Sequence, residues 1–208
     1  MDPPHPLACD VISGVLQGSV LGPLLFLLYL NSIQHVNLSP GTKMVLYADD
    51  ILFYKPVCCL EDYQLYQSDI NAVSMWLKWK HLSISPTKCK TMFVTCKRQS
   101  SMSNLPPILI ESIPTKKVTE IWYLGVLITS DLMWSNHISN IASKAWKVVG
   151  AIYRKFYRDM STPALFKFYL SLVRPVLEYC SPLWDPHLII KGHNTPRKSS
   201  KVCIKCLH

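Results

Sequence analysis

Two adjacent acidic residues set between apolar segments constrain this chain more than any other feature of its sequence. Asp49 and Asp50 follow Val45 and Leu46 and precede the apolar run at 51–53. Neighbouring carboxylates repel each other, and apolar surroundings raise the cost of both charges unless a cation neutralises them. Carboxylate oxygens are the ligands that hard divalent cations such as Mg²⁺ prefer. The pattern predicts a β-hairpin with a metal-binding turn, although Asp pairs are also ordinary turn residues.

A glycine-rich segment precedes the acidic pair. Three glycines lie between residues 14 and 22, and Pro23 follows them directly. Such glycines mark backbone that turns sharply or approaches another group closely. Gln17 and Gly18 are suited to form the floor of a nucleotide site. The simpler interpretation is a tight loop that leads into a core helix at 20–32, with Pro23 in its first turn.

Hydrophobic periodicity predicts an α+β fold. Besides the helix at 20–32, we expect hairpin strands at 43–47 and 51–54, a helix at 62–80, strands at 91–95, 118–121 and 123–128, and two helices after residue 134. The second of these two helices has Thr162 as its N-cap and Pro163 at its first position, and it ends or kinks at Pro175. Trp134 recurs with the apolar residues of the first helix, and we expect both Trp134 and Trp146 to lie in the core and not to stack on nucleic acid.

Positive charge is concentrated in the last part of the chain. Residues 1–133 carry a net charge of zero, and residues 134–208 carry the whole formal charge of +9. Five basic residues of the predicted helix after residue 134 lie largely off its apolar side: Lys144, Lys147, Arg154, Lys155 and Arg158. A one-sided basic region is typical of proteins that bind a phosphate backbone. A solvated helix face followed by a basic tail would give the same distribution.

Composition also bears on the cellular context. The apolar run at 20–30 contains Pro23 and is too short to cross a bilayer, so we expect no membrane partner. The eight cysteines are scattered without a pairing pattern, which favours reduced thiols in an intracellular protein, nuclear or cytoplasmic.

Five motifs follow one another along the chain, at residues 14–26, 47–50, 123–126, 131–138 and 172–179. Their order and spacing resemble the reverse transcriptases of non-LTR (LINE-type) retrotransposons. The resemblance implies an α+β fold in which residues 1–130 form a partial polymerase palm, an antiparallel sheet with helices. It further implies a helical thumb-like region over 131–187, and we expect residues 188–208 to be a basic tail without ordered structure.

The resemblance also assigns roles to individual residues. Asp49 and Asp50 match the catalytic carboxylates that ligate Mg²⁺. The other matched positions are the nucleotide-binding Gln17, Gly18, Tyr47 and Lys88 and the primer-grip residues Leu124 and Gly125. The implied chemistry is Mg²⁺-dependent addition of deoxynucleotides, from their triphosphates, to a DNA primer on an RNA template.

The match to the family pattern is incomplete. The family has a further metal-binding aspartate and nucleotide-binding fingers before the Gln17 motif, and this chain shows neither. Asp10 matches no motif, and Ser85 stands where the family usually has Asn. We therefore expect a polymerase fragment that is inactive by itself. The alternative is a non-catalytic nucleic-acid-binding or interaction remnant.

Overall fold

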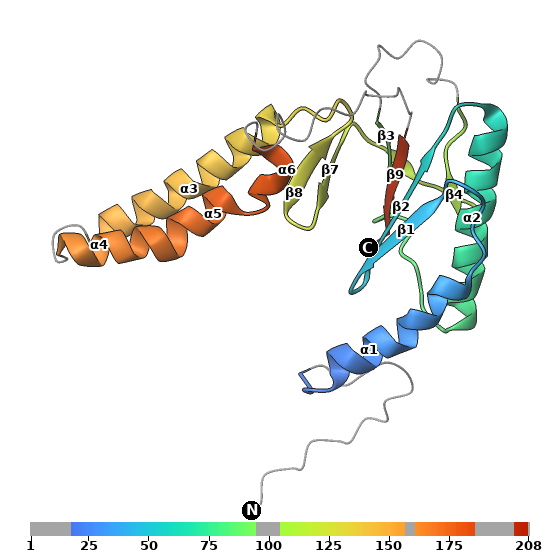
Figure 1. Cartoon of the computed structure of the whole chain (residues 1–208), viewed down its shortest axis with the longest axis horizontal. Coiled ribbons are helices and arrows are strands. Elements are labelled where there is room, and N and C mark those ends of the chain that lie inside the picture. Colours follow the sequence, from blue (N-terminus) through green and yellow to red (C-terminus); the bar gives the residue numbers. More distant parts are fainter. Residues whose placement is uncertain (1–17, 95–104, 157–160, 186–201, 208) are drawn as a thin grey trace, which may run out of the picture. The chain divides into compact units, whose positions relative to one another are not determined.

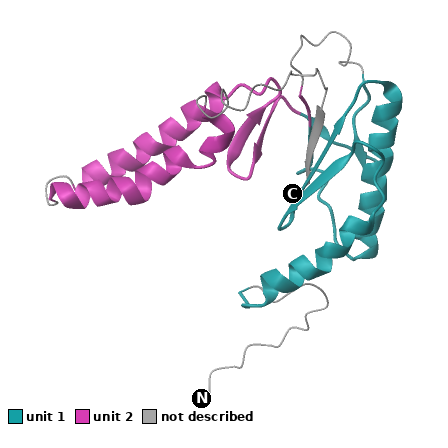
Figure 2. Ribbon diagram, viewed as in Figure 1, with its two compact units in different colours: residues 1–91, 104–117, 202–208 teal, residues 92–103, 118–201 magenta. Residues whose placement is uncertain are grey.

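The computed structural model describes residues 18–94, 105–156 and 161–185, together with the backbone of 202–207 (Figure 1). Helices and small sheets are mixed along the chain, which confirms the predicted α+β class. The chain divides into two compact units, one of residues 1–91, 104–117 and 202–208 and one of residues 92–103 and 118–201 (Figure 2). None of the helices in the described ranges combines the length and apolar character that a membrane span requires.

Most of a five-stranded sheet, in the order β1-β2-β9-β3-β6, belongs to the first unit. Its strands are β1 (Lys43–Tyr47), β2 (Asp50–Pro56), β9 (Val202–Leu207), β3 (Lys90–Val94) and β6 (Lys116–Lys117). β1 and β2 form the predicted antiparallel hairpin, in which Tyr47 pairs with Asp50 beside the turn. Alternate residues of β2 are buried, namely Ile51, Phe53 and Lys55, because this strand lies inside the sheet and one face is covered.

The strand β9 differs from the expectation of a tail without ordered structure. It pairs antiparallel with β2, placing Leu207 opposite Ile51 and Val202 opposite Pro56. This pairing satisfies the N–H and C=O groups along an edge of β2 that would otherwise need partners. The rest of the predicted tail, residues 188–201 and 208, lies outside the described residues.

Helix α2 (Leu60–Trp79) covers the sheet of the first unit (Figure 1). The hydroxyl of its buried Tyr66 donates to the Phe53 carbonyl at 3.2 Å. The helix begins two residues before the predicted start at 62, because the Asp62 carboxylate caps it. That carboxylate accepts hydrogen bonds from the backbone N–H groups of Cys58 at 2.8 Å and Cys59 at 3.3 Å. The bond from Cys58 is the main cause of the lowered pKa of Asp62.

Helix α1 (Gly22–Asn31) is apolar on all sides and runs on into the 3-10 turn η1 (Ser32–His35). Pro23 lies in its first turn, as predicted. Much of the apolar surface of this helix is exposed, namely Leu24, Leu25, Leu27 and Leu28. Its end is attached to the end of α2, since the Tyr29 hydroxyl donates to the Lys80 carbonyl at 2.5 Å and Lys80 Nζ lies 5.4 Å from the Tyr29 ring.

A buried polar network joins three segments of the first unit. Asp69 of α2 accepts hydrogen bonds from the Ser39 N–H at 2.8 Å, the Ser39 hydroxyl at 2.5 Å and the Thr42 hydroxyl at 2.5 Å. Lys55 of β2, only 2% exposed, donates from Nζ to the Ser39 hydroxyl oxygen at 2.6 Å. Ser39 therefore bridges a buried ammonium and a buried carboxylate. The network holds the loop before β1, the strand β2 and the helix α2 together.

Two short strands complete the first unit. β4 (Leu109–Ile110) and β5 (Ile113–Pro114) form an antiparallel pair. The Gln67 side chain of α2 binds both the N–H and the C=O of Leu109, each at 2.8 Å. The hydroxyls of Thr91 and Thr115 lie 2.6 Å apart and connect β3 to the segment before β6.

The second unit is a hairpin followed by helices. The hairpin strands are β7 (Glu120–Tyr123) and β8 (Val126–Thr129), and the helical elements are α3 (Ser135–Phe156), α4 (Thr162–Phe168), the π-helical turn η2 (Tyr169–Val173), α5 (Arg174–Glu178) and α6 (Ser181–Trp184). The α4-to-α5 segment runs alongside α3 (Figure 1). The rings of Phe156 and Phe168 stack with their centroids 5.4 Å apart. The strands β7 and β8 belong to the same compact unit as the helices that follow them. The boundary at residue 130 between a palm and a thumb-like region stays a prediction.

The helices after residue 134 confirm one expectation and correct two others. The chain changes from α4 to the wider turn η2 just before Pro175, whose ring would clash with the carbonyl four residues earlier in a regular α-helix. The N-cap of α4 is Ser161 and not Thr162, since Thr162 already belongs to the helix. The predicted burial of Trp146 is wrong, because its side chain is 74% exposed.

We predict that Asp69→Ala destabilises the protein by about 3 to 5 kcal/mol, because it removes the buried carboxylate that accepts from Ser39 and Thr42 and that balances the Lys55 ammonium through Ser39. Urea unfolding measures this loss. Glu61→Ala, an exposed acid on the same helix, is the control and should change the free energy of unfolding by less than about 0.5 kcal/mol. The double variant Lys55→Met with Asp69→Leu should be more stable than Asp69→Ala. Equal losses in Asp69→Ala and Glu61→Ala would contradict the network's role.

Candidate functional site

The acidic pair lies at the turn of the β1–β2 hairpin, as predicted. Ala48 and Asp49 form the two-residue turn between the paired Tyr47 and Asp50. Ala48 has φ +51°, a left-handed conformation that costs a residue with a Cβ about 1 kcal/mol. Asp49 is exposed and Asp50 is half-buried. The turn therefore presents one carboxylate to solvent and a second beside it at the end of β2.

Two adjacent carboxylates can hold a hard divalent cation that keeps several of its waters. Within the ranges that the structure describes, no group of three or more His, Cys, Asp or Glu side chains could hold a metal ion. The acidic turn by itself thus fits a weak Mg²⁺ site and not an enclosed one. Further oxygen ligands would have to come from a substrate or from another segment.

The other residues predicted at the nucleotide site lie on separate segments of the first unit. Tyr47 is 62% exposed next to the acidic turn. Gly18 has φ +87° in the turn before α1, and among the described residues apart from its chain neighbours no atom lies within 4 Å of the position that a Cβ would take. Lys88 is exposed in the turn before β3, where its N–H donates to the Ser85 carbonyl at 3.1 Å. Gln17 lies outside the described residues. The structure thus brings Tyr47 to the acids, and the roles of all these residues stay predictions.

The predicted primer-grip residues form the turn of the β7–β8 hairpin. Leu124 and Gly125 both have positive φ, +45° and +77°, which suits a tight two-residue turn. The Tyr179 hydroxyl donates to the Leu124 carbonyl at 2.9 Å, and a Cβ on Gly125 would lie 3.2 Å from the Tyr179 ring. Gly125 is therefore required both by its conformation and by this close approach. Sequence reasoning missed Tyr179, because its partner is 55 residues away.

A buried histidine organises the second unit. His137 of α3 is 0% exposed, and its ring centroid lies 6.3 Å from Trp122, 6.3 Å from Trp134 and 5.8 Å from Trp184. Its Nδ1 accepts a hydrogen bond from the Leu127 N–H at 3.2 Å, so the neutral ring carries its proton on Nε2. Nε2 is buried and has no hydrogen-bond partner within the described part of the chain. Burial first, and then the Lys144 charge, lower the pKa of His137.

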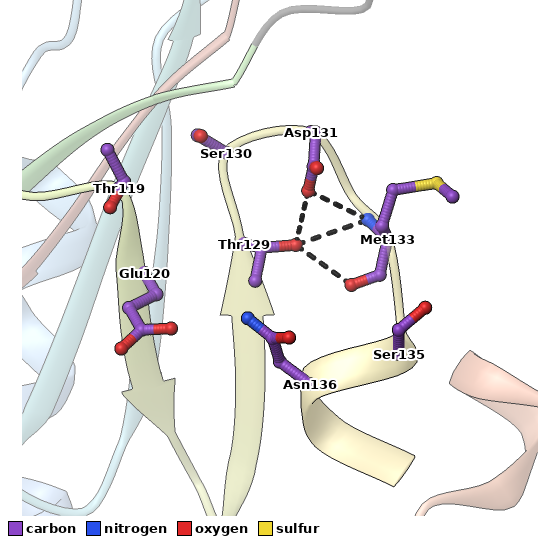
Figure 3. A pocket seen from close by; sticks show the side chains of 8 residues that line it. All are labelled: Thr119, Glu120, Thr129, Ser130, Asp131, Met133, Ser135 and Asn136. Atoms are coloured by element: carbon purple, nitrogen blue, oxygen red, sulfur yellow. Dashed lines mark hydrogen bonds between the residues drawn. The ribbon is translucent and has the colours of Figure 1, made fainter. Parts of the chain in front are cut away.

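A polar pocket of about 450 Å³ lies where β8 leads into α3 (Figure 3). It is lined by Thr119, Glu120, Thr129, Ser130, Asp131, Met133, Ser135 and Asn136. The Thr129 hydroxyl lies 2.6 Å from Asp131 Oδ1 and 2.9 Å from the Met133 carbonyl oxygen. The Thr129 hydroxyl, followed by the Met133 N–H, lowers the pKa of Asp131. These hydrogen bonds close the turn before α3, so the Asp131 carboxylate has a structural role in this pocket.

Four of the five predicted basic residues lie on α3, which contains no acidic residue. Lys144 Nζ lies 4.7 Å from the centroid of the Trp122 ring, a cation–π contact between α3 and β7. Lys147, Arg154 and Lys155 are exposed, whereas Arg158 lies outside the described residues. The helix thus presents positive charge to solvent without an acidic residue of its own.

Sequence comparison connects these features to known proteins. The profile described as "Reverse transcriptase (RNA-dependent DNA polymerase)" matches residues 9–128, more than half of the chain, including both hairpin turns. The chain is 28% identical over 188 residues to the probable RNA-directed DNA polymerase from transposon X-element of Drosophila melanogaster, a match that covers 86% of this chain. It is 30% identical over 136 residues, 62% of its length, to the RNA-directed DNA polymerase from mobile element jockey of Drosophila funebris.

A second D. melanogaster protein, the probable RNA-directed DNA polymerase from transposon BS, is 27% identical over 180 residues and 83% of this chain. These matches cover only 14 to 20% of the relatives' own lengths. The chain thus spans a fifth or less of the curated relatives. No solved structure matches it.

We predict that the protein loses stability as the pH falls below about 6.5 and that His137 accounts for much of the loss. Because the pKa of His137 is lower in the folded state, the unfolded chain binds more protons between the folded and unfolded pKa values, and unfolding is favoured as the pH falls through this window. The slope can reach about 1.4 kcal/mol per pH unit within the window and levels off below the folded pKa, and the contribution is fully present above about pH 6.5. Urea unfolding between pH 8 and 5 measures it. The non-titrating His137→Gln should lack this part of the slope, and parallel curves for both proteins would contradict the prediction.

Proposed function

The chain belongs to the reverse transcriptase (RNA-dependent DNA polymerase) family, and from that premise we propose that it is the palm and thumb portion of a non-LTR retrotransposon polymerase. The proposed palm spans residues 1–130 and the proposed thumb residues 131–187. The proposed reaction is the addition of deoxynucleotides to a DNA primer on an RNA template. The observation that carries the proposal is the hairpin turn with Asp49 and Asp50, which lies inside the matched segment.

The proposed metal ligands are the carboxylates of Asp49 and Asp50. A divalent ion bound there would supply charge stabilisation for phosphoryl transfer. Asp49 is exposed at the tip of the turn, so its oxygens can reach a shared ion without movement of the sheet. Asp50 is a strand residue, and its backbone is held by pairing with Tyr47. We propose that the exposed Asp49 carboxylate and the half-buried Asp50 carboxylate share one ion at this turn.

The remaining proposed roles are binding and orientation. Tyr47 presents an exposed ring beside the acids and is assigned to the primer end. Gly18, with open space around it, and Gln17 are assigned to the nucleotide and the template. Lys88 is assigned to the phosphates of the nucleotide. Binding of this kind contributes to catalysis mainly by holding the reactants in line.

The turn at Leu124 and Gly125 is assigned to the primer strand. Its tightness supports the assignment, because the Tyr179 hydroxyl fixes the Leu124 carbonyl and the Tyr179 ring lies against Gly125. A turn held on one side by an aromatic ring presents its other side with little freedom. That rigidity suits a contact that must keep a primer end in register with the catalytic carboxylates.

A second candidate function is non-catalytic nucleic-acid binding through the helical region. It is supported by the exposed Lys147, Arg154 and Lys155 on α3, a helix that lacks acidic residues. Phosphate contacts provide affinity independent of sequence and strongly dependent on salt. This function would remain in a chain that no longer polymerises.

We predict that residues 43–56 of this chain, grafted in place of the corresponding hairpin of the jockey polymerase, support primer extension on an RNA template with Mg²⁺. Asp49→Asn in the graft should lower the extension rate about 10²- to 10³-fold or more, because it removes an oxygen charge from the proposed metal site. Lys43→Gln in the same graft is the control and should leave the rate unchanged.

The same assay with the chain by itself tests whether the acidic turn is sufficient for catalysis without the rest of a polymerase. With only the two carboxylates of the turn, the chain should extend no primer, and its Asp49→Asn variant should behave identically. A graft whose activity survives Asp49→Asn would refute the assigned role of Asp49. Extension by the chain, absent in Asp49→Asn, would instead prove that its site is sufficient for catalysis.

We predict weak, sequence-independent binding of the chain to nucleic acid, with log Kd rising with log salt concentration. The variant tested carries Gln at Lys144, Lys147, Arg154, Lys155 and Arg158. Its salt slope should fall by about one for each phosphate that the variant no longer neutralises. Fluorescence anisotropy at several salt concentrations measures the slope.

The matched control carries the same change of charge on the first unit, with Gln at Lys43, Lys78, Lys90, Lys116 and Lys117. Because these lysines are exposed, the replacement should leave folding intact. A control that lowers the slope as much as the helix variant would assign the binding to net charge and would eliminate α3 as the binding face.

A further inference from the structure

The exposed Trp146 is a feature that the sequence pattern does not anticipate. Its side chain is 74% exposed, on the middle of the helix α3. By contrast, the nearby His137 and Ile141 are buried, at 0 and 7% exposure, on another side of the same helix. Exposing an indole forgoes the free energy that its burial would release. A large aromatic surface on a well-formed helix is therefore a candidate contact for a partner.

Two exposed basic residues lie on the same stretch of α3 as this indole. Trp146, Gly150 and Arg154 are spaced by four residues and lie along one row of the helix surface. A Cβ built on Gly150 would lie 3.3 Å from Arg154 Nη1, so the guanidinium lies back along the helix over Gly150, toward Trp146. Lys147 is exposed at the adjacent position. The row presents an aromatic face and, one turn further on, a glycine over which the positive charge of Arg154 lies.

The charges of this surface indicate the chemistry of its partner. α3 contains no acidic residue, and Lys147, Arg154 and Lys155 are all exposed. Complementarity therefore favours a polyanion whose backbone charges are regularly spaced. An exposed indole adds the ability to stack on a flat ring. A base can offer its face only where it is not already stacked on both sides, which favours a single strand over a duplex.

We propose that Trp146 is a stacking platform for an unpaired base of a single-stranded nucleic acid, with Lys147 and Arg154 holding the adjacent phosphates. This inference rests on the proposed binding of nucleic acid by α3, and it adds that the bound form is a single strand. Gly150 contributes to this surface because it has no side chain, which leaves room for the Arg154 guanidinium to lie over it on the side of Trp146. The surface thus combines sequence-independent stacking with charge, as sites for single strands do.

The test uses the full chain and two labelled probes, a 20-nucleotide RNA strand and the RNA–DNA duplex of the same sequence. Fluorescence anisotropy gives Kd for each at several salt concentrations. Trp146→Ala should weaken binding to the single strand about tenfold, and binding to the duplex less than about twofold. The salt slope should not change, since no charge is removed. Trp146→Phe should bind the single strand within about threefold of the original chain.

Two controls separate stacking from general effects. Trp79→Ala removes an indole that is 71% exposed on the first unit and should leave both affinities unchanged. Arg154→Gln should reduce the salt slope for the single strand by about one. The quenching of tryptophan fluorescence by the bound single strand should be smaller in Trp146→Phe, because a base stacked on the indole is the quencher.

Each result has a definite meaning. If the original chain binds neither probe, the nucleic-acid function itself is wrong, and the inference fails with it. If the log Kd of the original chain rises with log salt concentration but Trp146→Ala binds the single strand as tightly as the original chain does, only the stacking role is wrong. Equal losses for strand and duplex would also overturn it, since they would indicate a structural effect. A selective loss in Trp146→Ala that Phe restores would support it.

Discussion

The buried bridge from Lys55 through Ser39 to Asp69 is the constraint on which the first unit depends. An ammonium at 2% exposure and a carboxylate at 5% exposure are each costly to bury, and each becomes tolerable through hydrogen bonds to the same short loop. The loop lies directly before β1, and Lys55 lies near the end of β2. A slip of one residue in the hairpin would move Lys55 to the opposite face and break the bridge. The network thereby fixes the register that puts Asp49 and Asp50 at the turn.

The second unit depends on a different device, a neutral histidine enclosed by three indoles. Trp122 comes from β7, Trp134 from the segment before α3 and Trp184 from α6, so His137 joins the hairpin to both ends of the helical region. The Leu127 N–H donates to its Nδ1, and Lys144 covers Trp122. Together with Tyr179 on the Leu124 turn, these contacts make hairpin and helices one body. In the proposed function, the primer-grip turn and the basic helix would therefore move together.

The candidate site could be predicted from sequence where its geometry is local. Adjacent acids between apolar residues determine a hairpin turn, and the strand bounds at 43–47 agree with the prediction. Pro23 and Pro175 act at the helix positions expected from their missing N–H groups. The prediction was wrong for Trp146, because this residue lies off the helical row of apolar residues that includes Ile141 and Ala145, and the structure buries that row. The N-cap assigned to Thr162 was wrong by one residue, a common error where two capping residues adjoin.

The sequence alone determined the family, the α+β class and the acidic turn, since each rests on residues that are neighbours along the chain or on motifs in a fixed order. The tertiary structure decided which distant residues meet. Tyr179 reaches Leu124 across 55 residues, Asp69 reaches Ser39 across 30, and β9 pairs with β2 from the far end of the chain. It also decided which apolar surfaces stay exposed, on α1 and at Trp146. Burial and long-range pairing depend on the packing of whole elements, and no local pattern of residue types specifies that packing.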